Sequence, residues 1–226
     1  YDNNRLTNTM DAKYYNRLVK DESLPLYNNA TQARKAPGST FKPITAIAAL
    51  EENVFGLNDT VNCTGIYDAI TPPLRCWIYP GRHGIQNIVA GIRNSCNFFF
   101  ADLGHRLATN QQGEYDPALG IARLNKYATM FGLDQKSGVE IIENDPMISD
   151  QSPEQSAIGQ GTNSFANVQL SRYVTALANR GTVFDLSVLD RVTDWQGEAI
   201  RSYEPNVIRT MEVKPENWDA VQQGMR

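Results

Sequence analysis

The sequence of 226 residues contains no apolar run long enough to cross a bilayer, and its first residues, YDNNRLTNTMDAKYY, are too polar for a signal peptide. We therefore expect any membrane anchor or export signal to lie outside this sequence. The chain also has no basic block and no interleaving of basic and aromatic residues. With 21 Lys and Arg against 25 Asp and Glu, its formal net charge is −4, which argues against a nucleic-acid partner.

Cysteine and histidine are scarce, with three and two residues respectively. Because three is an odd number, the cysteines cannot all pair in disulfides within one chain, and at least one thiol has another role. Apolar residues make up 41% of the sequence, which is enough for a hydrophobic core in a chain of this length.

Apolar periodicity predicts a largely helical chain. Ile44, Ile47 and Leu50 recur at helical spacing, and Pro43 is tolerated there because it falls in the first turn. Other segments have patterns typical of a short helix (11–18, within an otherwise loop-like 1–33), longer helices (86–107, 118–132 and 165–180, the last with Gly181 at C′), a short strand (GVEII), two strands around the turn WQGE (182–203) and a final helix opening on Pro215.

Residues 56–86 form a long irregular stretch that contains Cys63, Cys76, several prolines and four glycines. It is too long and irregular to be an ordinary connection between two elements. We expect a functional or cross-linked loop here.

The stretch APGSTFKP raises the first question of chemistry, since Ser39 precedes Lys42 by three residues. Residues three apart on a helix share a face, so the amine can reach the hydroxyl. Serine is a weak nucleophile that needs a base, and burial can lower the pKa of a lysine enough for it to act as one. A serine that merely caps a helix would give the same pattern.

Four stretches together resemble the penicillin-binding proteins. APGSTFKP is similar to the family's S-x-x-K nucleophile motif, and IRNSCNFFF to its S-x-N motif, here Ser95, Cys96 and Asn97. LNKYATMFGLDQKSGVEI resembles the segment that follows, and SAIGQGTNSFANVQLSRYVTALANRGTVF resembles the G-Q-G stretch with its helix. Together with YDNNRLTNTMD, these stretches resemble class B, elongation-type D,D-transpeptidases. The resemblance runs over nearly the whole chain.

The resemblance implies a role for each matching residue. Ser39 would attack the D-alanyl-D-alanine carbonyl of a peptidoglycan stem peptide, and Lys42 would take its proton. Ser95 would relay a proton to the leaving amine, and Asn97 would bind the substrate amide. An amino group of a second stem peptide would release the acyl-enzyme, and a β-lactam would block Ser39. A satisfied polar pair in a helical segment is the other interpretation of Ser95 and Asn97.

One family motif is missing. The only KSG, Lys136 to Gly138, precedes the G-Q-G stretch, which is the wrong order for the family's third motif, K-T-G or K-S-G; we interpret it as a surface turn. The resemblance implies an α+β penicillin-binding/serine β-lactamase-like fold in which residues 1–226 form a partial transpeptidase domain. We expect it to lack the first strands and the K-T/S-G strand, so that helices dominate, the central antiparallel sheet is incomplete and the fragment alone is inactive. An incomplete sheet exposes strand edges, which favours a homodimer or a domain swap.

Cys63, Cys76, His83 and Cys96 are a candidate metal set. Three thiolates and one imidazole suit tetrahedral zinc, although the spacing C-x12-C-x6-H-x12-C matches no common finger. Some elongation-type members of the family carry a metal near the middle residue of the S-x-N motif, here Cys96. A Cys63–Cys76 disulfide, with Cys96 in the core and His83 on the surface, is the alternative.

The leading interpretation is a serine acyltransferase of cell-wall synthesis that needs no cofactor for catalysis and carries a candidate structural zinc. The resemblance implies stem peptides, β-lactam antibiotics and glycan-polymerising wall-synthesis proteins as partners. It also implies a protein anchored at the extracytoplasmic face of the bacterial membrane. A β-lactamase or β-lactam sensor of the same fold, and a non-catalytic binding module of the cell-wall machinery, are the alternatives.

Overall fold

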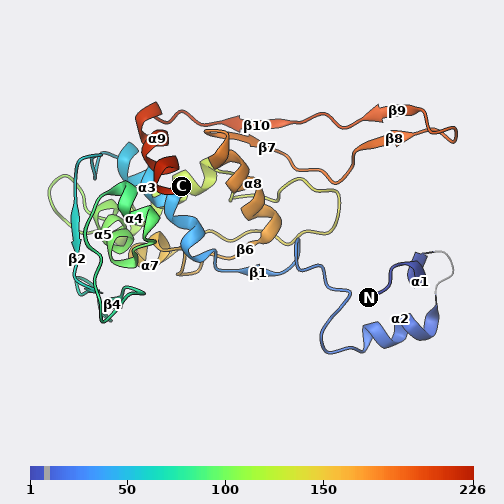
Figure 1. Ribbon diagram of the computed structural model, residues 1–226, viewed down its shortest axis with the longest axis horizontal. Coiled ribbons are helices and arrows are strands. Elements are labelled where there is room, and N and C mark those ends of the chain that lie inside the picture. The colour runs from blue at the N-terminus through green and yellow to red at the C-terminus, as the bar shows by residue number, and fades with distance from the viewer. Residues whose placement is uncertain (8–10) are drawn as a thin grey trace.

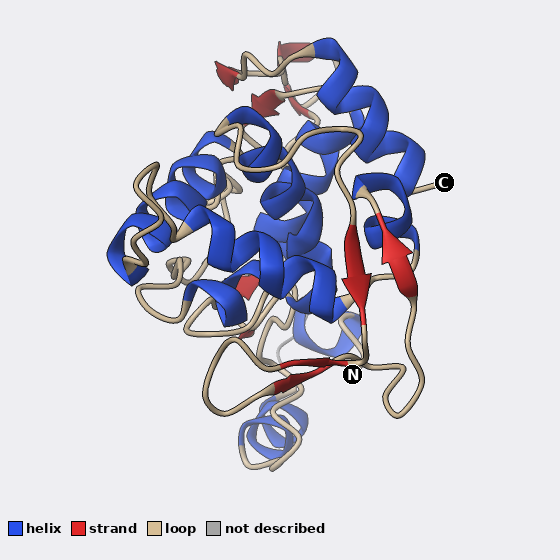
Figure 2. Cartoon of the chain, turned by 90° about the vertical axis from the view of Figure 1, so that its left-hand side faces the viewer, coloured by secondary structure: helices blue, strands red, loops and turns tan. Residues whose placement is uncertain are grey.

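The computed structural model describes residues 1–7 and 11–226. A buried helix lies at the centre of its helical part. In this helix, α3 (Lys42–Glu51), every residue from Lys42 to Leu50 is buried. A helix that is buried on all sides needs packing on all sides. Helices α5 (Asn97–Leu107), α6 (Pro117–Met130) and α9 (Pro215–Gly224) supply it. The helices gather in one body, which Figures 1 and 2 show from two sides.

The predicted helices are largely confirmed, with Pro43 in the first turn of α3 and Pro215 opening α9. Within residues 1–33, the predicted short helix is present and a second one was missed, while residues 8–10 lie outside the described residues. The remaining helical segments are α1 (Asn4–Thr7), α2 (Ala12–Val19), the 3-10 helix η1 (Gly38–Phe41), α4 (Ile88–Arg93), α7 (Pro153–Ala157) and α8 (Asn167–Ala178).

The single helix predicted over 86–107 is wrong, because α4 and α5 are separate helices. Ser95 between them has a φ of +46°, in the left-handed region that ends a helix. Cys96 has extended backbone and caps α5, its thiol accepting from the Phe99 N–H. The break turns Ser95 out of the helix and toward α3, which a continuous helix would not do.

The C′ position of α8 is also different from the prediction. Arg180, with a φ of +62°, takes the left-handed position, and Gly181 follows it with a φ of +105°. The Gly181 N–H donates to the Ala176 carbonyl over 2.7 Å, as in a Schellman motif. A Cβ at Gly181 would lie 2.9 Å from Met211 Cβ, so close packing requires glycine here as well.

Short antiparallel strands pair two by two throughout the described residues, and together with the helices they confirm the predicted α+β class. The predicted hairpin around WQGE is present as β8 with β9, at the far end of a ribbon that leaves the helical body (Figure 1). Dimerisation through an open strand edge stays a prediction that light scattering would test. The pairs are β1 (Arg34–Lys35) with β6 (Phe165–Ala166), β2 (Val61–Cys63) with β5 (Gly84–Gln86), β3 (Ile66–Tyr67) with β4 (Leu74–Arg75), β7 (Thr182–Phe184) with β10 (Val207–Thr210), and β8 (Arg191–Thr193) with β9 (Ala199–Ser202).

The segment KSGVEII contradicts two predictions. GVEII is not a strand, because Ile141 and Ile142 are 44% and 77% exposed and the segment has no buried face. The preceding KSG is not simply a surface turn, because Ser137 is fully buried. Its N–H and hydroxyl both donate to the carboxylate of Glu143, which draws the turn inward.

No helix among the described residues is long and apolar enough to span a membrane.

Candidate active site

Ser39 is exposed on η1, one turn ahead of α3. The turn that presents it depends on glycine, since Gly38 has a φ of +57° and its N–H donates to the Gly159 carbonyl over 2.9 Å. Gly159 in turn has no room for a side chain, because a Cβ there would lie 1.9 Å from the Gly38 carbonyl oxygen. The G-Q-G stretch therefore holds the nucleophile turn through direct backbone contact.

Two buried side chains hold this turn and the helices next to it in place. The hydroxyl of Tyr173, on α8, donates to the Thr40 carbonyl over 2.9 Å. The hydroxyl of Thr45, on α3, donates to the Ala157 carbonyl over 2.8 Å and ties α3 to α7, which leads into the G-Q-G stretch.

Lys42 points into the space between Ser39 and the break after α4. Its Nζ lies 3.1 Å from Ser39 Oγ and 3.0 Å from Ser95 Oγ. It also lies 2.7 Å from the Ser95 carbonyl oxygen and 2.7 Å from Asn97 Oδ1. The structure thus brings together all four residues that the sequence singled out for catalysis.

A neutral amine at Lys42 can satisfy all four neighbours of Nζ. Both carbonyl-type oxygens, from Ser95 and Asn97, can only accept, so they use two N–H groups. The other two neighbours are hydroxyls, which can donate as well as accept. In the neutral amine the lone pair therefore faces a hydroxyl, which is the arrangement required for taking a proton from Ser39.

Burial also favours the neutral form of Lys42. The side chain is 2% exposed, and loss of solvent lowers the pKa of Lys42 from 10.5 to about 8. Negative charge on the nearby pair of Cys96 and Cys76 acts in the opposite direction. The site can therefore supply a base and an exposed hydroxyl in direct contact, as acyl transfer through a serine requires.

The four residues of the candidate metal set also meet, although Cys63 and Cys96 are separated by 33 positions in the sequence. Cys63 ends β2, Cys76 follows β4, His83 precedes β5 and Cys96 caps α5, and their ligand atoms all lie within 4.8 Å of one another. His83 Nδ1 is 3.8 Å from Cys63 Sγ and 3.5 Å from Cys76 Sγ, while Cys76 Sγ is 3.8 Å from Cys96 Sγ.

These spacings fit a tetrahedral ion. Four ligands at zinc–sulfur distances of about 2.3 Å would lie about 3.8 Å apart. All three cysteines are free and buried, so the alternative Cys63–Cys76 disulfide is not formed. Hydrogen bonding from Cys96 lowers the pKa of the Cys76 thiol, and that bond together with burial raises the pKa of Cys96, so two crowded thiols share one proton.

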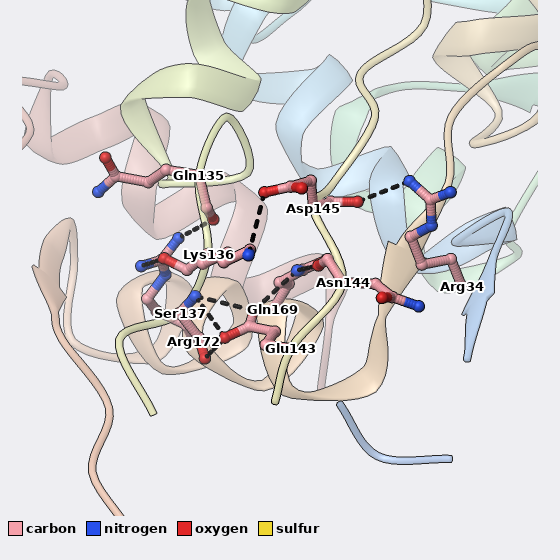
Figure 3. A network of polar contacts seen from close by, with 9 residues as sticks. All are labelled: Arg34, Gln135, Lys136, Ser137, Glu143, Asn144, Asp145, Gln169 and Arg172. Atoms are coloured by element: carbon pink, nitrogen blue, oxygen red, sulfur yellow. Dashed lines mark hydrogen bonds and ion pairs between the residues drawn. The ribbon is translucent and has the colours of Figure 1, made fainter. Parts of the chain in front are cut away.

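Several supporting residues could not be found from the sequence. Tyr173 and Thr45 look like ordinary members of apolar helices, and only their distant carbonyl partners give them a role. The same holds for Glu143 and Gln169, which hydrogen-bond to each other in the polar network of Figure 3. The two glycines of GQG were the only sequence feature that pointed to a supporting role near Ser39.

The family described as "Penicillin binding protein transpeptidase domain" matches residues 1–226. The peptidoglycan D,D-transpeptidase MrdA of Haemophilus influenzae is 28% identical over 247 residues, covering 100% of this chain and 35% of the relative. Stage V sporulation protein D of Bacillus subtilis is 34% identical over 184 residues, covering 78% of this chain and 25% of the relative. The chain thus spans about a third or less of the length of these curated relatives.

Solved structures show the same fold. Pseudomonas aeruginosa PBP2 in complex with WCK 5153 matches with a TM-score of 0.80 at 25% identity, over 100% of this chain and 51% of that chain. The imipenem acyl-enzyme complex of penicillin-binding protein A from M. tuberculosis matches with a TM-score of 0.80 at 20% identity, over 95% of this chain and 48% of that chain.

Proposed function

This chain belongs to the penicillin-binding protein transpeptidase family, and on that premise we propose that the whole protein is a peptidoglycan D,D-transpeptidase with Ser39 as its nucleophile. The observation that carries the proposal is the contact of a buried Lys42 amine, 3.1 Å away, with an exposed serine hydroxyl. The same proposal makes residues 1–226 part of a transpeptidase domain and 56–86 its metal-binding insertion.

In the first half-reaction, Ser39 Oγ forms a bond to the carbonyl carbon of the penultimate D-alanine as its proton moves to Lys42. The tetrahedral intermediate then expels the terminal D-alanine, whose nitrogen takes a proton. Ser95 Oγ, 3.0 Å from Lys42 Nζ, is suited to pass that proton from the ammonium to the leaving nitrogen. The product is an ester between Ser39 and the stem peptide.

In the second half-reaction, an amino group of another stem peptide attacks the ester carbon. The ester bond breaks, Ser39 regains a proton through Lys42, and a new peptide bond joins the two stems. The Asn97 side chain contacts Lys42 through Oδ1, which leaves its amide nitrogen as a donor for the substrate amide.

We further propose that Cys63, Cys76, His83 and Cys96 hold a structural zinc ion that catalysis itself does not require. When bound, the ion would neutralise the crowded thiols and fix the irregular 56–86 segment, which has little core of its own. Because Cys96 stands between Ser95 and Asn97, ordering its thiol would also order both neighbours. Elemental analysis of protein prepared without chelator should find one zinc per chain, and its absence would remove this proposal.

The relatives support a proposal for the partners and the location of the whole protein. One solved relative is described as a complex between PBP2 and MreC from Helicobacter pylori, and another as a peptidoglycan synthase complex that coordinates polymerization and crosslinking. We propose that this protein likewise works beside a glycan-polymerising partner, at the extracytoplasmic face of the bacterial membrane, and that β-lactams acylate it. Curated relatives named peptidoglycan D,D-transpeptidase favour this function over a β-lactamase, a β-lactam sensor or a binding module.

Incubating the whole protein with a fluorescent penicillin tests the function. Intact-mass measurement should show one long-lived adduct on the native protein and none on Ser39→Ala. An adduct that disappears within minutes would support the β-lactamase alternative, and equal labelling of Ser39→Ala would exclude Ser39 as the nucleophile.

A further inference from the structure

A buried carboxylate, that of Glu143, lies two hydrogen bonds away from the β1–β6 sheet that leads to the nucleophile, and the acyl-transfer chemistry does not use it. Glu143 is 6% exposed, and the groups that hydrogen-bond its carboxylate are neutral, while the Arg172 guanidinium lies near enough to interact with its charge. The Ser137 N–H lies 2.8 and 3.0 Å from its two oxygens, and the Ser137 hydroxyl donates over 2.7 Å. Gln169 Nε2 donates over 2.7 Å as the fourth contact.

Glu143 fixes the orientation of the Gln169 side chain, which is fully buried. Gln169 Nε2 donates to Glu143 and, over 2.8 Å, to the Asn144 carbonyl, while its Oε1 accepts from the Ala166 N–H over 2.8 Å. Both N–H groups of this amide and its oxygen therefore have hydrogen-bond partners. A flipped amide would place an oxygen against a carboxylate and a carbonyl, and an NH2 against an N–H.

The bond to Ala166 passes the constraint to the active site. Ala166 pairs with Arg34 in the two-stranded β1–β6 sheet. After Lys35, β1 runs through two residues into Gly38 and Ser39, and β6 follows the G-Q-G stretch at an interval of three residues. The Gly38 N–H bonds to the Gly159 carbonyl, so the two turns meet there. Both turns are continuous with the β1–β6 sheet, which Gln169 holds through Ala166.

A second set of contacts ties residues 143–145 to the segment that enters β1; Figure 3 shows the one between Asp145 and Arg34. Asn144 Nδ2 donates to the Gln32 carbonyl over 2.6 Å, and its N–H donates to the Thr31 carbonyl over 3.1 Å. Arg34 Nη1 donates to the Asp145 carbonyl over 2.7 Å. The loop that carries Glu143 thus grips the approach to the nucleophile on one side while Gln169 grips its partner strand on the other.

We propose that Glu143 and Gln169 are positioning residues that set the distance between the Ser39 turn and the G-Q-G turn, and so determine the rate of acylation rather than the affinity for substrate. The proposal rests on the proposed function for its kinetic readout. Neither residue touches the reacting atoms. A displacement of the nucleophile turn by a fraction of an ångström would slow the covalent step and leave noncovalent binding unchanged.

The test uses Glu143→Leu and Gln169→Leu in the whole protein. In Glu143→Leu, the Ser137 N–H, the Ser137 hydroxyl and the Gln169 NH2 group all lose the carboxylate that accepts from them. In Gln169→Leu, the link to Ala166 is removed outright. The control is Tyr127→Phe on α6, which loses the hydrogen bond that the Tyr127 hydroxyl donates to Glu52 over 3.0 Å and leaves the Glu143 contacts in place.

Saturation kinetics with a fluorescent penicillin should show the acylation rate constant falling about tenfold to a hundredfold in both variants, with the noncovalent dissociation constant unchanged and Tyr127→Phe like the native protein. Amide hydrogen exchange gives a readout that does not need activity. Gly38 N–H should exchange about tenfold faster in both variants than in the control, because its bond to Gly159 is loosened.

The outcomes separate the two proposals. If native protein labels and both variants label at the native rate, or only the dissociation constant changes, the positioning role is wrong. If native protein does not label, the proposed function fails, and Gly38 exchange alone then decides: exchange equal to that of Tyr127→Phe overturns the positioning role, and faster exchange supports it.

Discussion

Protonation of Lys42 should control the pH dependence of acylation. With a pKa of about 8 in place of 10.5, about 9% of the amine is neutral at pH 7, against about 0.03% for an exposed lysine. Burial thus raises the fraction of active base by roughly 300-fold, since the charged form cannot accept a proton. The sign is fixed: the rate rises as pH rises through the pKa.

The assay measures the second-order rate constant for labelling with a fluorescent penicillin from about pH 5.5 to about pH 9.5, the range in which the base titrates. It should increase about tenfold per pH unit at the acid end and level off above about pH 8. Lys42→Arg is the matched control, because a guanidinium keeps the charge and the donors but stays protonated throughout. A flat profile, or a Lys42→Arg variant that labels at more than about a tenth of the native rate, would refute the assignment of Lys42 as the base.

Three further changes have defined outcomes. Thr45→Val should lower the free energy of unfolding by about 1–3 kcal/mol in urea titrations, because the buried Ala157 carbonyl loses its donor; a change near zero would show that water or another group replaces it. Gly159→Ala should reduce the labelling rate by at least about a hundredfold, since its Cβ would overlap the Gly38 carbonyl and its φ is +77°, and near-native labelling would contradict the contact. A chelator should lower the melting temperature of the native protein but not of Cys76→Ser, and equal responses would argue against the cluster as the metal site.

The sequence was most informative where chemistry and local geometry coincide. Ser39 and Lys42 are three residues apart, so helical geometry alone predicts their contact. Pro43 and Pro215 fix helix starts because proline has no N–H to lose there. Motif order then predicted Ser95 and Asn97, although spacing alone could not bring them to Lys42.

The errors came from long-range contacts. The break at Ser95 was missed because apolar residues continue on both sides of it, and only the packing of Cys96 shows why the helix must stop. Ser137 looked like a turn residue on the surface, yet its burial depends on Glu143, six residues away. GVEII has the β-branched composition of a strand but finds no partner strand among the described residues, and its two isoleucines stay exposed.

The most direct measurement of the central claim is the location of the covalent adduct. Trypsin digestion of whole protein treated with benzylpenicillin should yield residues 36–75 as one peptide, because Lys42 is followed by Pro43, and Ser39 is the only serine in that peptide. This peptide should carry the penicilloyl group, and fragmentation should assign it to Ser39. An adduct on any other peptide, or on a threonine of this one, would contradict the claim that a buried amine activates Ser39.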